Sequence, residues 1–313
     1  MNPDTEIIRS VEVPKKRVSF SRVSKFNVCP LMYYFHYVLG DKEPASITLA
    51  FGTSVHSAIE SCLFSRKTSQ EMLPLSAALD VFIESLRNEI KNNDISLGGE
   101  NIEDLEKTGI ILVSKWHCER ASTVVPVQIE TPHLISIPGI EEPILLFLDL
   151  VEKNHGMFEE ANPEHLVVTD FKTSKTAYSL HDANLSLQLA LGCIATGTSL
   201  CRYDVLNKKK GDFQPVLGVM HLSVCEYLIE RFRKTVELIN RGIFIPPPPG
   251  EWPCTSSCYY WKKCAGKKIP DVVFEATERE KLRKAEEKER KKEETAAKKS
   301  RKGTTSPGKT KAA

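Results

Sequence analysis

Two aspartates and a lysine form the clearest chemical pattern in the sequence. Asp149 lies in the apolar run 144–151, and Asp170 and Lys172 directly follow the apolar, β-branched run 166–169. Because side chains alternate between the faces of a strand, Asp170 and Lys172 lie on one face and Phe171 on the other. A carboxylate and an ammonium at the end of a buried strand are costly unless they are paired or take part in chemistry. A solvated strand end with a local ion pair is the alternative.

Two neighbouring strands that each end in a carboxylate form an oxygen-rich site, which suits Mg²⁺ or Mn²⁺. A divalent ion lowers the pKa of its water and polarises a phosphoryl oxygen. A lysine beside the ion holds the nucleophile or stabilises the developing charge. These residues therefore point to metal-dependent attack of water on a phosphodiester.

The elements that must position these residues follow from the hydrophobic periodicity. It predicts a short helix that begins after Ser19, and then a succession of further helices and strands. The helices are expected at about 50–63, 76–90, 102–118, 181–195 and 223–240, and the strands at 123–129, 133–137, 144–151, from 166 onward, and at 215–222. This order predicts an α/β fold, with a central mixed β-sheet flanked by helices. The block at about 64–120 is expected to be a helical insertion that serves as scaffold or lid.

Composition divides the chain of 313 residues into three parts. Residues 1–18 lack a sustained period and predict a flexible arm, and residues 19–272 form the folded domain. Residues 273–313 predict a charged tail, helical at first and then disordered. From Glu275 onward there are 14 Lys+Arg against 8 Asp+Glu, so the net charge of +2 leaves the body mildly acidic. The tail either adds salt-sensitive affinity for DNA or serves only solubility.

Several classes of protein are excluded by missing patterns. No run of 18 apolar residues predicts a transmembrane helix, and the first twenty residues lack the apolar core of a signal peptide. We therefore expect a cytoplasmic protein with no membrane partner. The chain has neither a Walker A motif nor a Gly-x-Ser-x-Gly motif, which excludes a P-loop NTPase motor and a hydrolase with that nucleophile turn.

The nine cysteines are many for a reducing compartment, where structural disulfides are rare. Cys254, Cys258 and Cys264 place three thiols within eleven residues. Zinc sites usually take their ligands as two close pairs, so this trio needs a fourth ligand from a distant part of the chain. The remaining cysteines lie among apolar residues and are predicted to be core: Cys62, Cys118, Cys193, Cys201 and Cys225.

Together these motifs resemble those of the PD-(D/E)XK nuclease superfamily. Asp149, a spacer of about twenty residues and Asp170-x-Lys172 resemble its two metal-binding motifs. Phe51-Gly52-Thr53-x-x-His56-x-x-x-Glu60 resembles the Gly-x-x-x-His motif of the RecB-type branch, and Gln188 resembles the branch's glutamine motif. Cys29-Pro30 with the three late cysteines resembles the iron–sulfur staple of AddB and of CRISPR-associated RecB-like exonucleases. The resemblance covers roughly residues 19–268.

The resemblance implies a role for each candidate residue. The metal ligands would be Asp149, Asp170, the backbone carbonyl of Phe171, and His56, which the helix brings to the site. Lys172 would position the attacking water, and Glu60 and Gln188 would orient water, metal or substrate. The three candidates on predicted helices each have a structural alternative: a core histidine for His56, a solvated helix face for Glu60 and a surface polar residue for Gln188.

The resemblance also implies a 4Fe–4S cluster on the three late cysteines, with Cys29 as the fourth ligand. Such a cluster would tie the first helix to the C-terminal region and close a loop of over two hundred residues, which lowers the entropy of the unfolded chain. Zinc on the same four cysteines is the alternative.

The function expected from this resemblance is a metal-dependent DNA nuclease, most readily an exonuclease acting on single strands or ends. Partners in DNA repair, in a phage or in CRISPR adaptation are compatible with it. The alternative is a non-catalytic DNA-binding subunit of a repair or recombination complex, in which the iron–sulfur nuclease fold is structural. Two positions depart from the family's pattern: Phe147 stands where a glycine is usual, and Gly192 where a tyrosine is usual.

Overall fold

A computed structural model describes residues 18–93, 95, 97, 99–248, 252–255, 258–268 and 282–290. The chain divides into two compact units, Met1–Phe244 and Ile245–Ala313. The first unit holds the sheet and its helices. The predicted arm, except for Val18, and most of the predicted tail lie outside the described residues.

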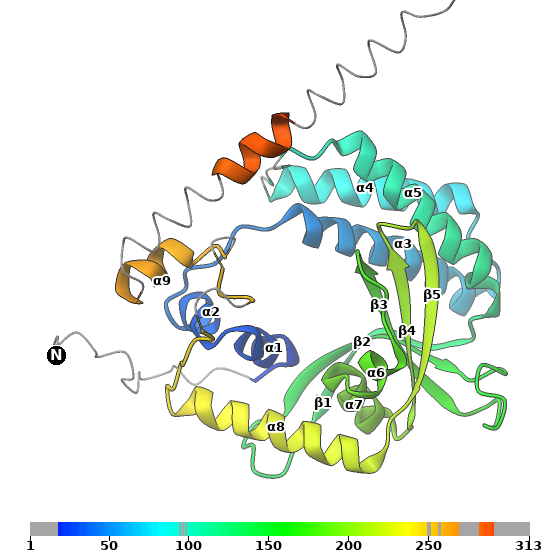
Figure 1. Ribbon diagram of the computed structural model, residues 1–313. Coiled ribbons are helices and arrows are strands. Elements are labelled where there is room, and N and C mark those ends of the chain that lie inside the picture. The colour runs from blue at the N-terminus through cyan, green and yellow to red at the C-terminus, as the bar shows by residue number, and fades with distance from the viewer. Residues whose placement is uncertain are drawn as a thin grey trace, which may run out of the picture. The chain divides into compact units, whose positions relative to one another are not determined.

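The centre of the first unit is a five-stranded mixed sheet, which confirms the predicted fold class (Figure 1). Its strands lie side by side in chain order, β1-β2-β3-β4-β5. Strands β3 and β4 are parallel and every other neighbouring pair is antiparallel. A parallel pair needs a crossover connection, and helices α6 and α7 supply it. The strands are β1 (Pro126–Ile135), β2 (Ile144–Lys153), β3 (Leu166–Ser174), β4 (Leu200–Asn207) and β5 (Asp212–Val219).

Helices cover both faces of this sheet (Figure 1). One face packs against α3 (Ile47–Ser69) and α5 (Ile102–Glu119), and α4 (Leu75–Asn92) packs on these two helices. The opposite face packs against α1 (Phe20–Val28), α2 (Pro30–Tyr33), α6 (Leu180–Asn184), α7 (Leu187–Thr196) and α8 (Leu222–Asn240). A π-helical turn at Tyr34–Val38 and a 3₁₀ turn at Ala121–Thr123 complete these layers.

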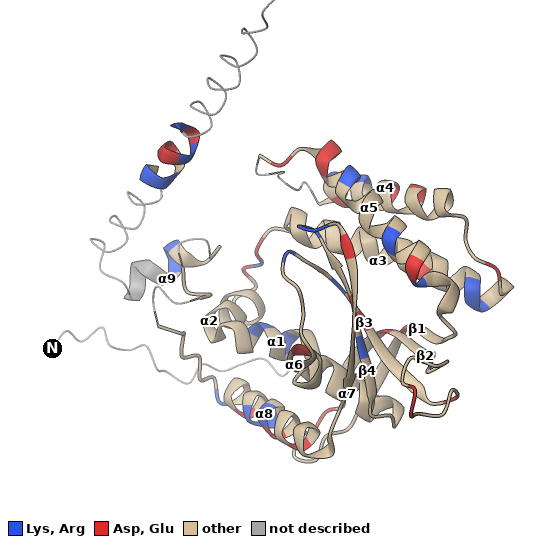
Figure 2. Cartoon of the chain, turned by 45° about the vertical axis from the view of Figure 1, so that its right-hand side comes forward, with Lys and Arg blue, Asp and Glu red and all other residues tan. Residues whose placement is uncertain are grey.

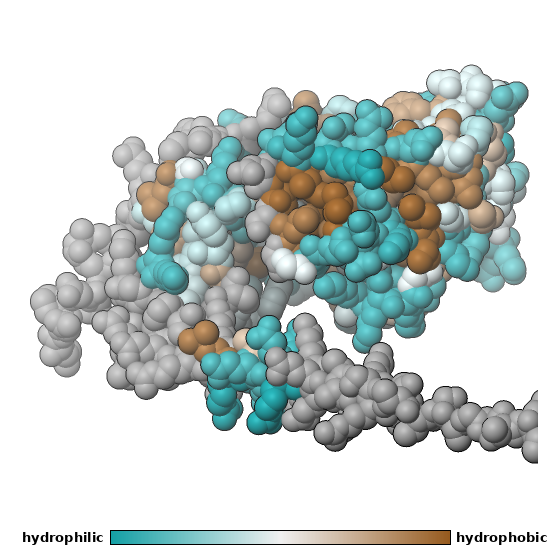
Figure 3. All heavy atoms as spheres, turned by 90° about the horizontal axis from the view of Figure 1, so that it is seen from above, coloured by the Kyte–Doolittle hydropathy of each residue, from teal (hydrophilic) through white to brown (hydrophobic). Residues whose placement is uncertain are grey.

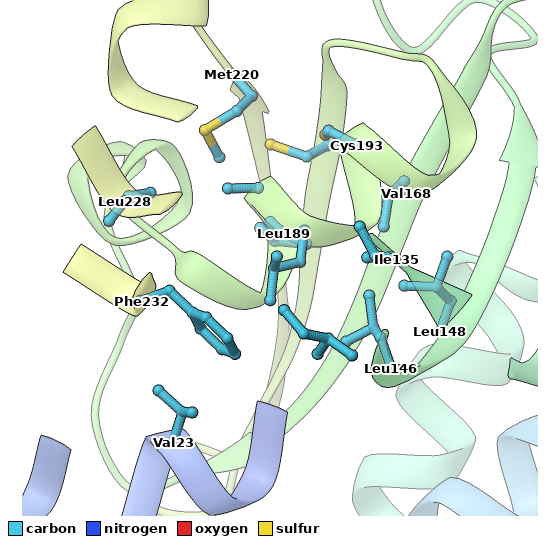
Figure 4. Packing of buried hydrophobic residues seen from close by; sticks show 14 of the residues in the cluster. Val23, Ile135, Leu146, Leu148, Val168, Leu189, Cys193, Met220, Leu228 and Phe232 are labelled. Carbon is cyan, nitrogen blue, oxygen red and sulfur yellow. The ribbon is translucent and has the colours of Figure 1, made fainter. Parts of the chain in front are cut away.

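Each face of the sheet has its own hydrophobic core. The core under α3–α5 includes the large side chains of Phe51, Phe82 and Trp116, all at most 1% exposed. The other core joins Leu146 and Leu148 of the sheet with side chains of α1, α7 and α8 (Figure 4). The mean hydropathy of the whole chain is −0.26. The surface seen in Figure 3 mixes hydrophilic areas with apolar patches.

Helix α3 is the central helix of its layer. Ser46 caps its first turn, accepting a hydrogen bond from the Leu49 amide at 3.2 Å. Among the described helices, α3 is the one long and apolar enough to cross a membrane by length and composition. Its buried residues, from Ala50 to Leu63, pack in the core of the first unit, which accounts for that composition.

Several boundaries differ from the sequence predictions. The strands expected at 123–129 and 133–137 form one strand, β1, and Pro132 fits there because β1 lies at the sheet edge. The helix expected at 181–195 is broken into α6 and α7. Cys29 lies between α1 and α2 in extended conformation. Helical geometry is disfavoured for a residue that precedes a proline, which explains the break between α1 and α2 at Cys29.

The second unit contains α9 (Trp261–Lys268) and a helix over 282–290. All nine residues of the latter helix are exposed. Its side chains carry both signs of charge (Figure 2). This composition agrees with the predicted solvated, charged helix in the tail.

Candidate metal centre

The candidate site lies where strands β2 and β3 stop pairing. Their ladder runs from Lys153 with Leu166 to Leu150 with Thr169, and Asp149 and Asp170 come directly after the last pair. The Phe171 amide then donates a hydrogen bond to Asp149 Oδ2 at 2.9 Å. Both aspartates lie inside their strands, within the predicted runs 144–151 and 166 onward, and not at the strand ends.

Three side chains from three elements converge beside this gap. Ligand atoms of His56 on α3, Glu130 on β1 and Asp149 on β2 all lie within 4.8 Å of one another. His56 Nδ1 is 3.8 Å from Asp149 Oδ2. One imidazole and two carboxylates are a donor set suited to Mn²⁺ or Mg²⁺.

Glu130 was missed by the sequence reasoning. It is the residue opposite Asp149, between the pairs Ile129–Leu150 and Thr131–Leu148. The available signal was a carboxylate one residue beyond the strand predicted at 123–129. Its backbone is left-handed, with φ of 44°, although it lies in a strand. Strained backbone conformations of this kind are concentrated at functional sites.

Asp170 and Lys172 form a pair next to this group. Asp170 is 3% exposed, and Lys172 Nζ lies 2.5 Å from its Oδ2. The ammonium compensates Oδ2, whereas Oδ1 has no hydrogen-bond partner among the described residues. A buried carboxylate oxygen without a donor is costly, and a cation would compensate for it.

The ammonium of Lys172 is held by neighbours from two further elements. It donates to Gln188 Oε1 on α7 at 3.1 Å and lies 5.7 Å from the ring centre of Tyr203 on β4. The Tyr203 hydroxyl is 2.6 Å from Oγ of Ser186, the cap residue of α7. Burial alone would lower the pKa of Lys172, but the Asp170 carboxylate outweighs it and raises that pKa. Lys172 is therefore a permanent cation here and not a proton acceptor.

The carboxyl groups of the site repel one another. Burial, and then the Asp149 carboxylate, raise the pKa of Glu130 to about 7. Burial raises the pKa of Asp170 to about 6, against the opposing effect of Lys172. Burial likewise raises the pKa of Asp149, which the Phe171 amide partly offsets, and the pKa of Glu60. A divalent cation would relieve this repulsion.

His56 has the protonation state that a metal ligand needs. Burial lowers its pKa, although Asp170 acts in the opposite direction, so the imidazole is neutral at pH 7. Its ring packs edge-on against Phe171, with 5.9 Å between ring centres. The neutral ring, the carboxylates and the unpartnered Oδ1 of Asp170 together fit a divalent metal ion.

The other predicted residues stand as follows. Glu60 lies one turn beyond His56 on α3 and acts electrostatically on Asp149 and Glu130. The roles of Glu60, Gln188 and the Phe171 carbonyl stay predictions, and so does metal ligation at each site residue.

The cysteines predicted as cluster ligands belong to both units: Cys29 to the first and the other three to the second. Within the second unit, Cys254 and Cys258 pack against Trp261. The structure shows no cysteine cluster among the residues it describes.

The cysteines predicted as core divide into two groups. Cys62, Cys193 and Cys201 are buried as predicted, and Cys225 is half-buried. The prediction is wrong for Cys118, which is exposed. It lies two residues past Trp116 on α5 and therefore points away from the buried stripe of that helix.

Comparisons with known proteins agree with this geometry. The model of the PD-(D/E)XK nuclease superfamily matches residues 17–265, which include the whole sheet and every candidate site residue named above. The solved structure of SSO0001 shares 16% identity over 64% of this chain and 78% of that chain, with a TM-score of 0.27, a likeness too low to support an argument. No curated protein matches. The chain belongs to the PD-(D/E)XK nuclease superfamily.

Proposed function

We propose that this protein is a metal-dependent deoxyribonuclease that degrades DNA from single strands or ends. Membership of the superfamily suggests metal-dependent phosphodiester hydrolysis in general. The convergence of His56, Glu130 and Asp149 within 4.8 Å, with the Asp170–Lys172 pair beside them, is the observation that carries the proposal. The exonuclease mode follows from the resemblance to the RecB-type branch.

His56, Glu130, Asp149 and Asp170 would hold Mg²⁺ or Mn²⁺. When bound, the ion would acidify water and polarise a phosphoryl oxygen. The Lys172 ammonium would orient the attacking water and stabilise the negative charge that develops on the phosphate. Gln188 would fix the ammonium in place through the hydrogen bond that it accepts from Nζ.

End-labelled single-stranded DNA, incubated with Mg²⁺ or Mn²⁺, tests this proposal. The wild type should degrade the DNA, while Asp170→Ala and Lys172→Ala should not. Glu226→Gln, which changes an exposed acid on α8, serves as the matched control and should leave the rate unchanged. A circular single strand that resists cleavage would support the exonuclease mode.

A wild-type protein that binds DNA but cuts none with either metal would overturn the nuclease. That result would favour the alternative, a non-catalytic DNA-binding subunit of a repair or recombination complex. For the nuclease we expect a cytoplasmic setting in DNA repair, a phage or CRISPR adaptation.

We further propose that Cys29, Cys254, Cys258 and Cys264 hold a 4Fe–4S cluster. The spacing of the late trio and the Cys29-Pro30 pair support it. Purified protein should be brown, with absorption near ~400 nm typical of iron–sulfur centres. Cys258→Ser should lose the colour, and the exposed Cys118→Ser should keep it. A colourless protein with stoichiometric zinc would overturn the cluster.

A further inference from the structure

An exposed apolar strip leads away from the candidate metal centre along β1 and β2. It consists of two cross-strand pairs, Pro132 with Phe147 and Leu134 with Leu145. Phe147 is 52% exposed and Leu134 is 60% exposed, Pro132 is exposed, and Leu145 is half-buried. Four contiguous apolar residues with this exposure are more than the scattered exposure normal for a protein surface.

The strip faces the same way as the Asp149 carboxylate of the candidate metal centre. Leu146 and Leu148 point into the core with α1, α7 and α8 (Figure 4). Because side chains alternate along a strand, Phe147 and Asp149 both point to the opposite face. Two residues of strand span about 6.6 Å, so the Phe147 ring begins close to the metal ligands. Pro132 has the same relation to Glu130 on the paired strand.

We propose that Phe147, supported by Pro132, is a stacking platform for an unpaired DNA base next to the phosphate at the metal centre. Stacking on an aromatic ring needs a base that is free of its partner, so the platform would favour single-stranded DNA. The proposal rests on the proposed function.

Binding measured by fluorescence anisotropy tests the platform, with a labelled single-stranded thymidine oligonucleotide and EDTA to prevent cleavage. Phe147→Ala should weaken binding by about tenfold, the range for loss of one stacked base. Phe147→Trp should retain the affinity, while Phe147→Leu should lose most of it because leucine is apolar but not aromatic. Tyr227→Ala on α8 is the matched control, since it removes a 62% exposed aromatic residue.

An oligonucleotide of abasic sites separates stacking from other effects. Wild type and Phe147→Ala should bind this backbone equally. An equal loss on normal and abasic DNA would overturn the proposal, because Phe147 would then act through the fold. Unchanged affinity of Phe147→Ala for normal DNA would also overturn the proposal. If the oligomeric state changed while the DNA affinity did not, the strip would instead be a contact between copies of the chain.

The platform and the nuclease can fail separately. If Phe147→Ala weakens binding to normal but not abasic DNA, while the wild type cuts nothing, the platform stands and the catalytic proposal falls. If the wild type cuts DNA and Phe147→Ala binds and cuts DNA as the wild type does, the catalytic proposal stands and the platform falls. Thermal unfolding of each variant in EDTA verifies that all are folded.

Discussion

Glu130 shows how one residue can be costly for the fold and suited to the site. Its backbone has a φ of 44° inside a strand, and its carboxyl group faces Asp149, Glu60 and Asp170. Left-handed backbone in a non-glycine residue costs of order 1 kcal/mol or more. Burial, and then repulsion from the neighbouring carboxylates, raises the pKa of Glu130 to about 7. Bound metal would offset the electrostatic part of this cost.

Replacing Glu130 with glutamine should therefore stabilise the metal-free protein. Folding raises the pKa of Glu130, so the protonated carboxyl group stabilises the folded state at low pH. This stabilisation is lost as pH rises through about 7 and the group ionises. In EDTA, Glu130→Gln should melt roughly 2–4 °C above wild type at pH 8, if about 1 kcal/mol is regained. The difference should be smaller at pH 6.

Manganese should reverse that order, because a ligand that binds the folded state raises its melting temperature. Wild type should gain clearly more from Mn²⁺ than Glu130→Gln does. Glu226→Gln, an exposed change, should match wild type in both conditions. Identical melting of Glu130→Gln and wild type at both pH values would contradict this account.

At the scale of elements, Lys172 depends on a closed set of contacts between β3, β4 and α7. Tyr203 lies opposite Asp170 in the β3–β4 register, and its ring lies beside the Lys172 ammonium. Its hydroxyl meets Ser186, which caps the helix that carries Gln188. Gln188, which accepts the hydrogen bond from the ammonium, is thus positioned by the first turn of α7.

Tyr203→Phe should loosen α7 without removing any group that touches DNA. We expect kcat to fall roughly tenfold or more, because small displacements at a reacting centre are costly, while DNA affinity stays unchanged. The control is Tyr33→Phe, another buried tyrosine, which lies on α2. Equal losses of kcat and affinity, or none, would show that the Tyr203 hydroxyl does not position Lys172.

A buried ionic network joins α5 to the sheet. Arg120, just after α5, pairs with Glu152 of β2 and with Asp204 of β4, and Asp204 also pairs with Arg202. These four side chains are at most 7% exposed. Trp116 adds a hydrogen bond to Asp204 at 3.1 Å. The network fixes the helical layer over the strands that carry the site.

Removing Arg120 would leave the buried Glu152 carboxylate without its paired cation and Asp204 with Arg202 alone. Arg120→Ala should lower the free energy of unfolding by about 3–5 kcal/mol, measured by urea denaturation. Lys115→Ala breaks the exposed pair with Glu119 on the same helix and should cost at most about 1 kcal/mol. A loss below 1 kcal/mol for Arg120→Ala would show that the network does not hold the layers together.

Local patterns allowed much of this fold to be predicted, and long-range pairing accounts for what was missed. Spacing along one strand predicted that Asp170 and Lys172 share a face of β3. Glu130 depended on the register of β1 against β2, which no local pattern reveals. Strand β4 was not predicted, because its eight residues are all buried and include Arg202 and Asp204, so it shows no alternation.

At the scale of the molecule, charge is distributed unevenly along the chain. The tail from Glu275 onward has 14 Lys+Arg against 8 Asp+Glu, whereas the rest is mildly acidic. Within the described part of this tail, the helix at 282–290 is exposed along its whole length and carries charges of both signs (Figure 2). Its composition suits contact with solvent more than packing against a core.

Ending the chain at Val273 tests whether this tail contributes to DNA binding. If it does, the shortened protein should bind single-stranded DNA less tightly at low salt, and its affinity should fall less steeply with salt. Each lost phosphate contact should reduce that slope by about 0.7 for single strands. The two proteins should converge at high salt, and their cleavage rates at saturating DNA should agree, because the candidate metal centre is built from residues 56–188. Equal slopes would mean that the tail serves solubility alone.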